Sequence, residues 1–369
     1  MRKQRLQNIV KPSINEILKY IPGESLIRGN RKIIKLSSNE SPFKLPKSVF
    51  SSLQKILSES NLYPDGDVKA LKQAIAKKFD LQTDQIICGN GSDDILSIIA
   101  QTFGREGGEV ICTEFGFMYY PIIARAAGAK VVTAKAENLS ISCKNILKEI
   151  NRNTNLIFLA NPNNPTGTVI FKKELENFIK KIPSNIIIVL DGAYSEFIID
   201  QNYCDGINLV NKFPNLIVTR TFSKIFGLAG IRLGWAYSNR NIINLLEKIR
   251  GPFNVNSIAQ ELGCYVLKNK NLLKKSIKHN LKWQKKLPKI INNLGLEAFD
   301  TFTNFVLVKV NKNNSKEKIL QGLLKNGIIV RELNNYGLKE YFRVSIGTDP
   351  EIKEFLKTLE KILKKSNEI

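Results

Sequence analysis

The sequence predicts an α/β protein, with a mostly parallel sheet sandwiched by helices in a large domain and a second, smaller α+β domain. Through the middle of the chain, short apolar runs alternate with helical patterns, and several runs lack the polar alternation of a half-exposed strand. Continuous runs of this kind are typical of strands that are buried on both faces of a parallel sheet. After residue 258 the pattern changes to a long basic helical stretch followed by alternating strands.

The expected elements follow from apolar periodicity and from glycine and proline punctuation. An N-terminal helix and arm are expected in residues 1–30, then a strand and loop at 32–46, a helix at 67–82, and a strand, turn and helix at 85–103. The remaining strands of the large sheet are expected at 108–114, 130–136, 155–162, 185–191, 215–222 and 232–238. The smaller domain is expected to hold a helical stretch at 259–295, strands at 304–310, 327–333 and 341–348, and a C-terminal helix. We expect the large domain to span 45–258 and the smaller one to combine 1–44 with 259–369.

Composition limits the class of protein. The 369 residues, 43% of them hydrophobic, are enough for one large core or two domains. The longest apolar runs are far shorter than a membrane span. The basic N-terminus lacks the apolar segment and small-residue cleavage site of a signal peptide. We therefore expect a cytoplasmic protein.

The formal net charge of +23 is compatible with nucleic acid, an acidic membrane surface or anionic small molecules as partners. However, lysines are spread along the whole chain and alternate with apolar residues at helical spacing. That distribution is typical of solvated helix faces. We therefore expect small anionic substrates, and neither nucleic acid nor a membrane.

Cysteine and histidine usage excludes several chemistries. The five cysteines are scattered without a CxxC spacing, so neither a zinc site nor a disulfide framework is expected, and no other metal site is proposed. The single histidine, His279, lies in a lysine-rich helical stretch. Any general base must therefore be another residue type, and a lysine is a candidate.

The stretch TRTFSKIFGLAGIRLGW, residues 219–235, places one lysine among small residues. A strand-like run leads to Ser223 and Lys224, and Arg232 follows after several glycines and alanines. A lysine with little to pair with loses its proton more easily than a lysine in water, and the neutral amine is a nucleophile. On this stretch alone, an ordinary surface lysine remains the alternative.

Two other strand ends carry polar groups. In GNGSDD, residues 89–94, the glycines permit a tight turn that leaves the N–H groups of Ser92 and Asp93 at a helix N-terminus, which is a phosphate seat. An ordinary helix cap would explain the same residues. In NPNNPTG, residues 161–167, asparagines on a stiff loop supply donors, although turn chemistry alone would also explain them.

Asp191 ends the run of 185–191, in which every residue between Asn185 and Asp191 is apolar, and the phenol of Tyr194 follows three residues later. We expect its carboxylate to be half-buried and to need a cationic partner, because an unpaired charge is costly away from water. A simple capping role is the alternative.

These features are all expected at the carboxyl ends of buried strands, where open α/β sheets bind ligands. A phosphate seat, a fixed carboxylate, amide and phenol donors and a sheltered lysine are the parts needed to hold pyridoxal 5'-phosphate. Their order resembles the fold-type-I, class-II pyridoxal-phosphate-dependent aminotransferases, and within them the histidinol-phosphate aminotransferases. The resemblance covers nearly the whole chain and rests on KYIPGES, LSSNESP, YPDG, GNGSDDIL, GFMYY, NPNNPTG, LDGAY, TFSKIFGLAGIRLGW and FRVSIG. Two departures are Gly192, where the family usually has Glu, and Ser41, where Pro is commoner.

The resemblance implies a role for each residue around the cofactor ring. Lys224 corresponds to the lysine that binds the cofactor aldehyde and then moves the substrate proton. Asp191 corresponds to the carboxylate that keeps the pyridine nitrogen protonated. Asn164 and Tyr194 correspond to the donors to the ring oxygen O3′, and Phe117 corresponds to the aromatic side chain that stacks on the ring.

The resemblance also implies how the cofactor phosphate is held. The N–H groups of Ser92 and Asp93, the hydroxyl of Ser223 and the guanidinium of Arg232 surround it. Tyr63 resembles a tyrosine that reaches this phosphate from the other subunit, which implies a homodimer.

For the substrate, Arg343 and Arg331 match two anion-binding arginines, and Tyr20 and Asn39 match residues that close the pocket. Two arginines and a tyrosine favour a dianion such as a phosphate monoester. The resemblance therefore implies amino transfer between L-histidinol phosphate and 2-oxoglutarate, a step of histidine biosynthesis. An aromatic amino acid aminotransferase, a threonine-phosphate decarboxylase, and a nucleic-acid-binding protein on an aminotransferase scaffold remain alternatives.

Overall fold

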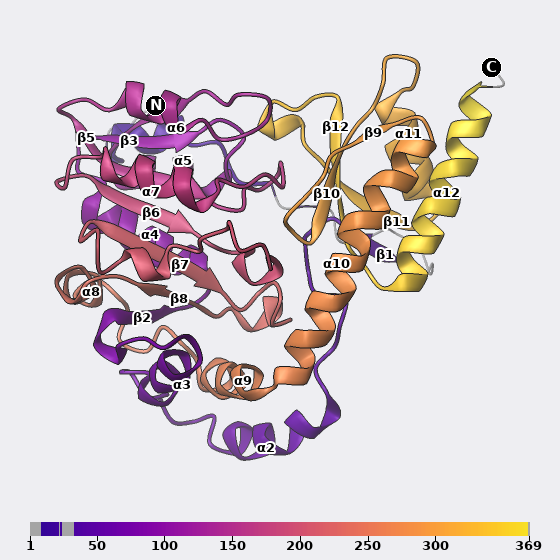
Figure 1. Cartoon of the computed structure of the whole chain (residues 1–369). Coiled ribbons are helices and arrows are strands. Elements are labelled where there is room, and N and C mark those ends of the chain that lie inside the picture. The colour runs from indigo at the N-terminus through magenta and orange to yellow at the C-terminus, as the bar shows by residue number, and fades with distance from the viewer. Residues whose placement is uncertain (1–8, 22, 24–32, 368–369) are drawn as a thin grey trace.

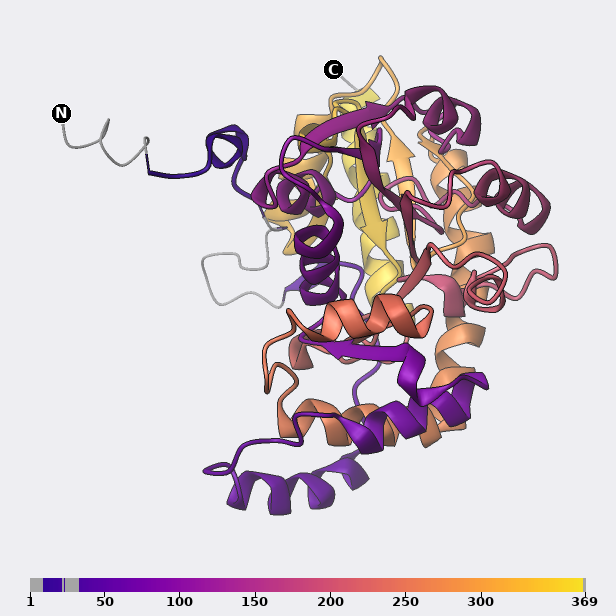
Figure 2. The same cartoon turned by 90° about the vertical axis from the view of Figure 1, so that its left-hand side faces the viewer.

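The computed structural model describes residues 9–21, 23 and 33–367. The expected N-terminal helix falls partly on residues 1–8, 22 and 24–32, which lie outside the described residues. Within 9–21 the helical structure is limited to the short 3-10 helix η1 (Pro12–Glu16). In Figure 2 the segment that holds η1 projects from the side of the molecule. Among the described residues, no helix combines the length and apolarity that crossing a membrane requires.

A seven-stranded sheet forms the larger part of the structure (Figure 1). Its strands are β2 (Ile86–Gly89), β3 (Glu109–Thr113), β4 (Lys130–Ala134), β5 (Thr154–Ala160), β6 (Ile187–Asp191), β7 (Leu216–Thr221) and β8 (Gly234–Tyr237). They lie in the order β2-β8-β7-β6-β5-β3-β4, and β8 alone runs antiparallel to its neighbours. All the strands expected for this sheet are therefore confirmed.

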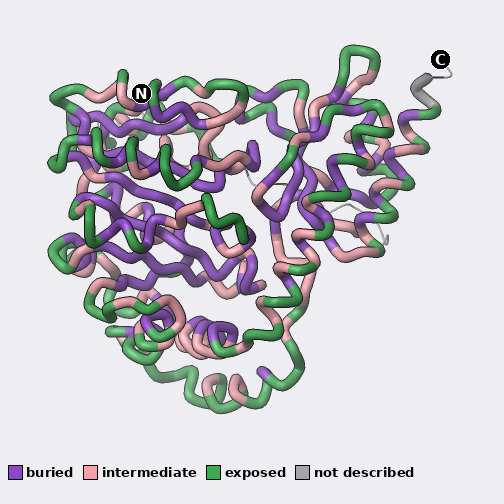
Figure 3. Tube along the Cα trace, in the orientation of Figure 1, coloured by how far each residue is buried: buried purple, intermediate pink, exposed green. Residues whose placement is uncertain are grey.

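Helices cover both faces of this sheet. One face packs against α3 (Lys69–Phe79), α6 (Cys143–Glu149), α7 (Lys172–Lys180) and α9 (Ser257–Lys268). The other packs against α4 (Ser92–Phe103), α5 (Tyr119–Ala126) and α8 (Arg240–Glu247). Along β5, Ile157 points into the first layer and Phe158 into the second, and both are fully buried. Figure 3 shows the central part of the large sheet as mostly buried. Burial on both faces explains why these strands lack polar alternation.

A second sheet has the order β1-β11-β12-β10-β9. Its strands are β1 (Ile34–Leu36), β9 (Glu297–Ala298), β10 (Phe305–Lys309), β11 (Ile328–Glu332) and β12 (Tyr341–Ser345). One face packs against α10 (Lys270–Asn293), α11 (Lys316–Lys325) and α12 (Asp349–Asn367). The other face is turned toward the carboxyl ends of the large sheet (Figure 1).

The helical stretch expected at 259–295 is confirmed and consists of two helices, α9 and α10. The chain breaks at Asn269, whose side chain accepts a hydrogen bond of 3.0 Å from the backbone of Leu272 and so caps α10. α9 packs into the core of the large sheet, whereas α10 reaches the core of the small sheet. A short helix that the sequence did not indicate, α2 (Phe50–Ser58), lies near α9 at the edge of the large sheet.

Candidate active site

A pocket of about 390 Å³ lies between the carboxyl ends of the large sheet and the open face of the small one. Its size is within the range of small-molecule sites. All of the predicted site residues except Tyr63 line it: Tyr20, Asn39, Ser92, Asp93, Phe117, Asn164, Asp191, Tyr194, Ser223, Lys224, Arg232, Arg331 and Arg343. The fold therefore brings together, at one place, residues that are hundreds of positions apart in the sequence.

Tyr63 lies outside the pocket. Its side chain is 81% exposed and stacks on Phe253, with the ring centroids 4.5 Å apart. Its predicted contact with a cofactor phosphate of another subunit remains a prediction.

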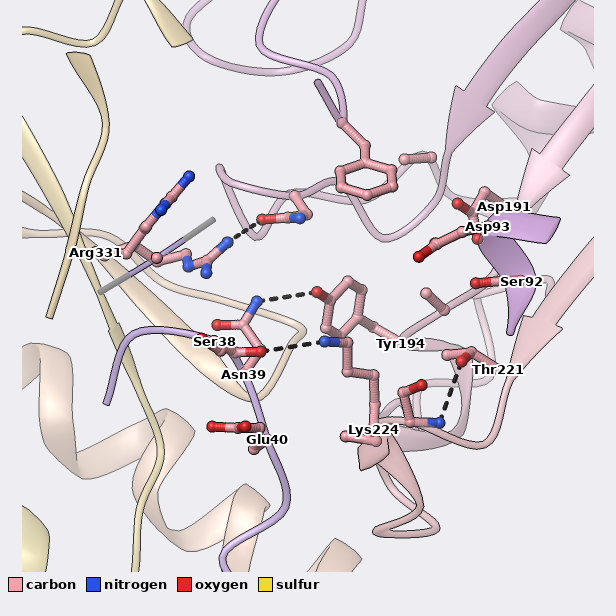
Figure 4. Close-up of a pocket in the computed structure, with 18 of the residues that line it drawn as sticks. Ser38, Asn39, Glu40, Ser92, Asp93, Asp191, Tyr194, Thr221, Lys224 and Arg331 are labelled. Carbon is pink, nitrogen blue, oxygen red and sulfur yellow. Dashed lines mark hydrogen bonds between the residues drawn. The ribbon is translucent and has the colours of Figure 1, made fainter. Parts of the chain in front are cut away.

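Lys224 follows β7 and points its amine into the pocket (Figure 4). The Nζ atom donates a hydrogen bond of 3.2 Å to the carbonyl oxygen of Ser38 and lies 5.9 Å from the ring centroid of Tyr194. Removal from water, and then the nearby Arg343 guanidinium, lower the pKa of Lys224 to about 8. The neutral, nucleophilic amine is therefore available close to neutral pH.

Asp191, the last residue of β6, differs from expectation. It is only 6% exposed, and its partner is a phenol: the hydroxyl of Tyr120 donates a hydrogen bond of 2.8 Å to Oδ2. Among the described residues no cation pairs with it, and its buried Oδ1 makes no hydrogen bond of normal length, although the Thr219 hydroxyl and the Ala193 backbone N–H stabilise its charge weakly. Burial raises the pKa of Asp191, and the Tyr120 bond opposes this shift. A buried carboxylate oxygen without a protein partner fits a ligand that brings a donor.

The groups predicted to bind the cofactor phosphate lie together in the structure. Helix α4 begins at Ser92, directly after Gly91, whose φ of +90° favours glycine. A Cβ atom at Gly91 would lie 2.3 Å from Nη2 of Arg232, so the glycine also makes room for this arginine. Arg232 donates to Ser223 Oγ at 3.3 Å and to Asp93 Oδ2 at 3.3 Å. A helix N-terminus, a hydroxyl and a guanidinium thus converge.

The loop 161–167 uses its asparagines in two ways. Asn161 exchanges hydrogen bonds with the backbone of Ile170, and Asn163 donates to Thr166, so both hold the loop in shape. Asn164 instead lines the pocket, where its side-chain oxygen accepts a hydrogen bond from Arg343. The structure therefore assigns the pocket-facing role to the asparagine that the sequence predicted.

Arg331 and Arg343 are direct cross-strand neighbours on β11 and β12 and both line the pocket. Arg343 is 5% exposed and donates to the carbonyl oxygen of Ser37 at 2.9 Å, while Arg331 donates to that of Ile21 at 2.8 Å. Neither pairs with a carboxylate among the described residues. Like charges facing each other across strands repel, so this pair fits a bound anion.

A match to a protein family identifies the class of protein that contains this pocket. A family model described as aminotransferase class I and II matches residues 31–359. The chain belongs to this family. Histidinol-phosphate aminotransferase from Rhodopseudomonas palustris is 39% identical to this aminotransferase over 344 residues, which cover 92% of this chain and 94% of that protein.

Solved structures agree on the fold of this aminotransferase. Histidinol-phosphate aminotransferase from Sinorhizobium meliloti, in complex with pyridoxal-5'-phosphate, superposes with a TM-score of 0.88 at 26% identity, covering 95% of this chain and 97% of that one. L-threonine-O-3-phosphate decarboxylase from Porphyromonas gingivalis reaches a TM-score of 0.79 at 22% identity, covering 90% and 100%, a likeness of fold alone. The predicted fold-type-I architecture is confirmed.

Several pocket residues of this aminotransferase were not predicted. Tyr120, on α5, contacts Asp191, stacks on Phe158 with the centroids 4.9 Å apart, and meets the edge of Phe117 at 5.6 Å. A signal existed, because Tyr120 follows Phe117 by three residues, about one helical turn. The stretch holds two adjacent tyrosines, however, and its pattern alone does not tell which one faces the sheet.

Lys35 and Glu40 also line the pocket and form an ion pair of 2.8 Å. Tyr336 lines it as well, from the short helix η7 (Asn334–Tyr336). Nothing in the local sequence distinguishes these residues from an ordinary strand lysine, loop glutamate and turn tyrosine.

Proposed function

We propose that this aminotransferase transfers an amino group between L-histidinol phosphate and 2-oxoglutarate, with pyridoxal 5'-phosphate as its cofactor. The observation that carries the proposal is the pair of arginines, Arg331 and Arg343, which face a pocket holding a lysine with a lowered pKa. The curated relatives that match over most of the chain bear the name of this activity, which supports the choice of substrate.

The residues present fit the cofactor. The N–H groups at the start of α4, with Ser223 and Arg232, would hold its phosphate. The unpartnered Oδ1 of Asp191 would accept the proton of its ring nitrogen, and Lys224 would bind its aldehyde. The remaining ring contacts would come from Phe117, Asn164 and Tyr194, which line the same pocket. When bound, this cofactor accepts the amino group and draws electrons from the substrate α-carbon.

The protein's own groups would then handle the proton and the substrate. The amine of Lys224 would take the proton from the substrate α-carbon and return it, which is general base and acid catalysis by a group with a pKa close to the working pH. Arg331 and Arg343 would bind the substrate phosphate, and Tyr20 and Asn39 would close the pocket around it. In support, Tyr20 meets the edge of Phe117 with the centroids 6.4 Å apart.

The proposal includes a cytoplasmic homodimer in which Tyr63 reaches the cofactor phosphate of the other subunit. Exposed apolar side chains support it: Phe253 stacks on Tyr63, and Phe50, Leu57 and Leu62, which precede Tyr63 in the sequence, are exposed as well. Exposed apolar patches of this kind mark protein interfaces. We also propose that residues 45–258 form the large domain and that residues 1–44 and 259–369 together form the smaller one.

Borohydride reduction of the protein loaded with pyridoxal phosphate is expected to fix the cofactor to Lys224. The rate at which the cofactor-free protein attaches pyridoxal phosphate should rise with pH through a midpoint near 8, because below this pH the amine of Lys224 is largely protonated and above it the amine is free. Peptide mass mapping after reduction gives the position of the label, and reduction at timed intervals at each pH gives the midpoint of the attachment rate.

Lys316 is the internal control for this labelling. It is also buried, but its Nζ pairs with Glu332 at 2.9 Å and does not line the pocket. A label on Lys316 or any other lysine contradicts the site, and a midpoint near the ordinary lysine value contradicts the sheltered amine.

Arg331→Ala is expected to impair histidinol phosphate much more than phenylalanine. A partly buried, charge-assisted contact is worth roughly 2–4 kcal/mol, or about 30- to 1,000-fold in kcat/KM. Phenylalanine lacks the phosphate and has little use for the second arginine. The measurement is kcat/KM of both substrates, and of threonine phosphate, for the wild type and the variant.

The ratio between substrates separates phosphate binding from damage to the N-terminal arm, because the bond from Arg331 to Ile21 serves either substrate. If phenylalanine is the better substrate and the change is silent, the aromatic aminotransferase is correct. Release of carbon dioxide from threonine phosphate would favour the decarboxylase. Loss of all three activities with salt-sensitive DNA binding would make the +23 charge the functional feature.

A further inference from the structure

Ser345, Asn39 and Tyr194 form a chain of hydrogen bonds that no predicted role accounts for. The backbone N–H of Asn39 donates to Ser345 Oγ at 2.8 Å, and Ser345 Oγ donates to Asn39 Oδ1 at 3.0 Å. The side-chain Nδ2 of Asn39 then donates to the hydroxyl oxygen of Tyr194 at 2.9 Å (Figure 4). All three residues are buried.

This chain has a fixed direction. A backbone N–H can only donate, so Ser345 Oγ accepts that bond and uses its single proton for Asn39 Oδ1. The other end of the Asn39 amide, which faces Tyr194, is therefore its NH₂ group. Tyr194 accepts this bond with its oxygen and keeps its own proton free. In the described part of the chain, no protein acceptor takes that proton.

The backbone reinforces the arrangement. Asn39 has a φ of +56°, a conformation that asparagine tolerates better than most residues, and its carbonyl oxygen accepts a hydrogen bond of 2.9 Å from Asn304. The amide therefore has partners at both ends and on its backbone. A buried amide with a donor at one end and an acceptor at the other favours this orientation over the flipped one.

We propose that Ser345 is a positioning residue, which aims the proton of Tyr194 into the pocket by fixing the orientation of the Asn39 amide. The inference rests on the proposed function, in which the Tyr194 proton would meet the cofactor oxygen O3′. A donor at that oxygen favours its anion. It therefore lowers the pH at which the nitrogen joining Lys224 to the cofactor loses its proton.

The position of Ser345 on β12 links this chain of hydrogen bonds to the anion-binding Arg343. Ser345 lies on β12 two residues after Arg343, and alternate residues of a strand share a face. The strand that carries the anion-binding arginine thus also carries the hydroxyl that orients Tyr194. A shift of this strand when an anion binds would reach Tyr194 through two hydrogen bonds, and the cofactor through a third.

The test is a double-mutant cycle read by visible absorbance of the protein loaded with pyridoxal phosphate, titrated with pH. Tyr194→Phe should raise the midpoint of the colour change. Ser345→Ala should raise it by about 0.4 to 1 pH unit, the size of one hydrogen bond. The double variant should match Tyr194→Phe alone, because Ser345 acts only through Tyr194.

Two further variants serve as controls. Ser345→Thr keeps the hydroxyl and should restore the wild-type midpoint. Ser276→Ala removes a buried hydroxyl on α10 that has no hydrogen-bond partner among the residues the structure describes, and should leave the midpoint unchanged. The dissociation constant of pyridoxal phosphate is measured for both variants, because it reports whether the pocket stays formed.

Additive shifts in the cycle, or no shift for Ser345→Ala, overturn the inference while leaving the proposed function in place. If Ser345→Ala does not fold, Asn39→Asp replaces it. A carboxylate has no N–H, so Tyr194 must donate to it, and adding Tyr194→Phe should then give no further shift. A wild-type protein without a visible band would overturn the proposed function itself.

Discussion

Lys224→Arg is expected to lower kcat on the order of 10⁴-fold or more, because it removes both the nucleophile and the proton carrier. Arginine keeps the positive charge, but its guanidinium does not lose a proton at working pH. At position 224, burial and the Arg343 charge already disfavour a cation, which is why lysine there has a pKa of about 8. Single-turnover and steady-state assays with histidinol phosphate measure the loss, and thermal unfolding checks the fold.

The control for this variant is Lys316→Arg. Lys316 is buried and paired with Glu332, so charge retention is all that its environment requires, and turnover should stay within a few-fold of wild type. If Lys224→Arg fails to fold because a fourth arginine crowds the pocket, Lys224→Met, which is uncharged, should show the same loss. A kcat within tenfold of wild type for either variant would remove Lys224 from the mechanism.

The parts of the fold that the sequence predicted are those set by burial. The runs at 186–190 and 216–218 are apolar throughout because both faces of β6 and β7 are covered by helices. Parallel strands end at one edge of the sheet, so the predicted gathering of Asp191 and Lys224 followed from topology. Predicting that these two residues meet at this edge required no knowledge of contacts between distant residues.

The parts that the sequence did not predict depend on contacts between distant residues. The phenol that bonds Asp191 comes from α5, and the hydroxyl that orients Asn39 comes from β12, 306 positions away. Local pattern carries no information on such pairs. The sequence did not indicate the helix break at Asn269 for a different reason. A single asparagine lowers the helix propensity of a basic helical pattern only slightly, and the break becomes clear only once its side chain is seen to cap the next helix.

Asp191→Asn is expected to reduce kcat severely while leaving cofactor affinity nearly unchanged. Asparagine keeps the volume of the side chain, and its oxygen can still accept the hydrogen bond of the Tyr120 hydroxyl. What it lacks is the charge that would keep the cofactor ring nitrogen protonated. The loss should be roughly 3–6 kcal/mol of transition-state stabilisation, or about 10²- to 10⁴-fold, as for other buried electrostatic partners.

The burial of Asp191 strengthens the effect of its charge on a group bound beside it. The carboxylate of Asp191 has no cation among the described residues and its pKa is raised by desolvation, so a protonated ring nitrogen would be its natural partner. Glu109→Gln is the matched control: Glu109 is also a buried acid at a strand end of the same sheet, but it is held by Asn151 and lies outside the pocket. The measurements are kcat, the dissociation constant of pyridoxal phosphate and thermal unfolding for both variants. If Asp191→Asn keeps near wild-type kcat, or if Glu109→Gln loses as much, the charge of Asp191 does not serve the cofactor ring.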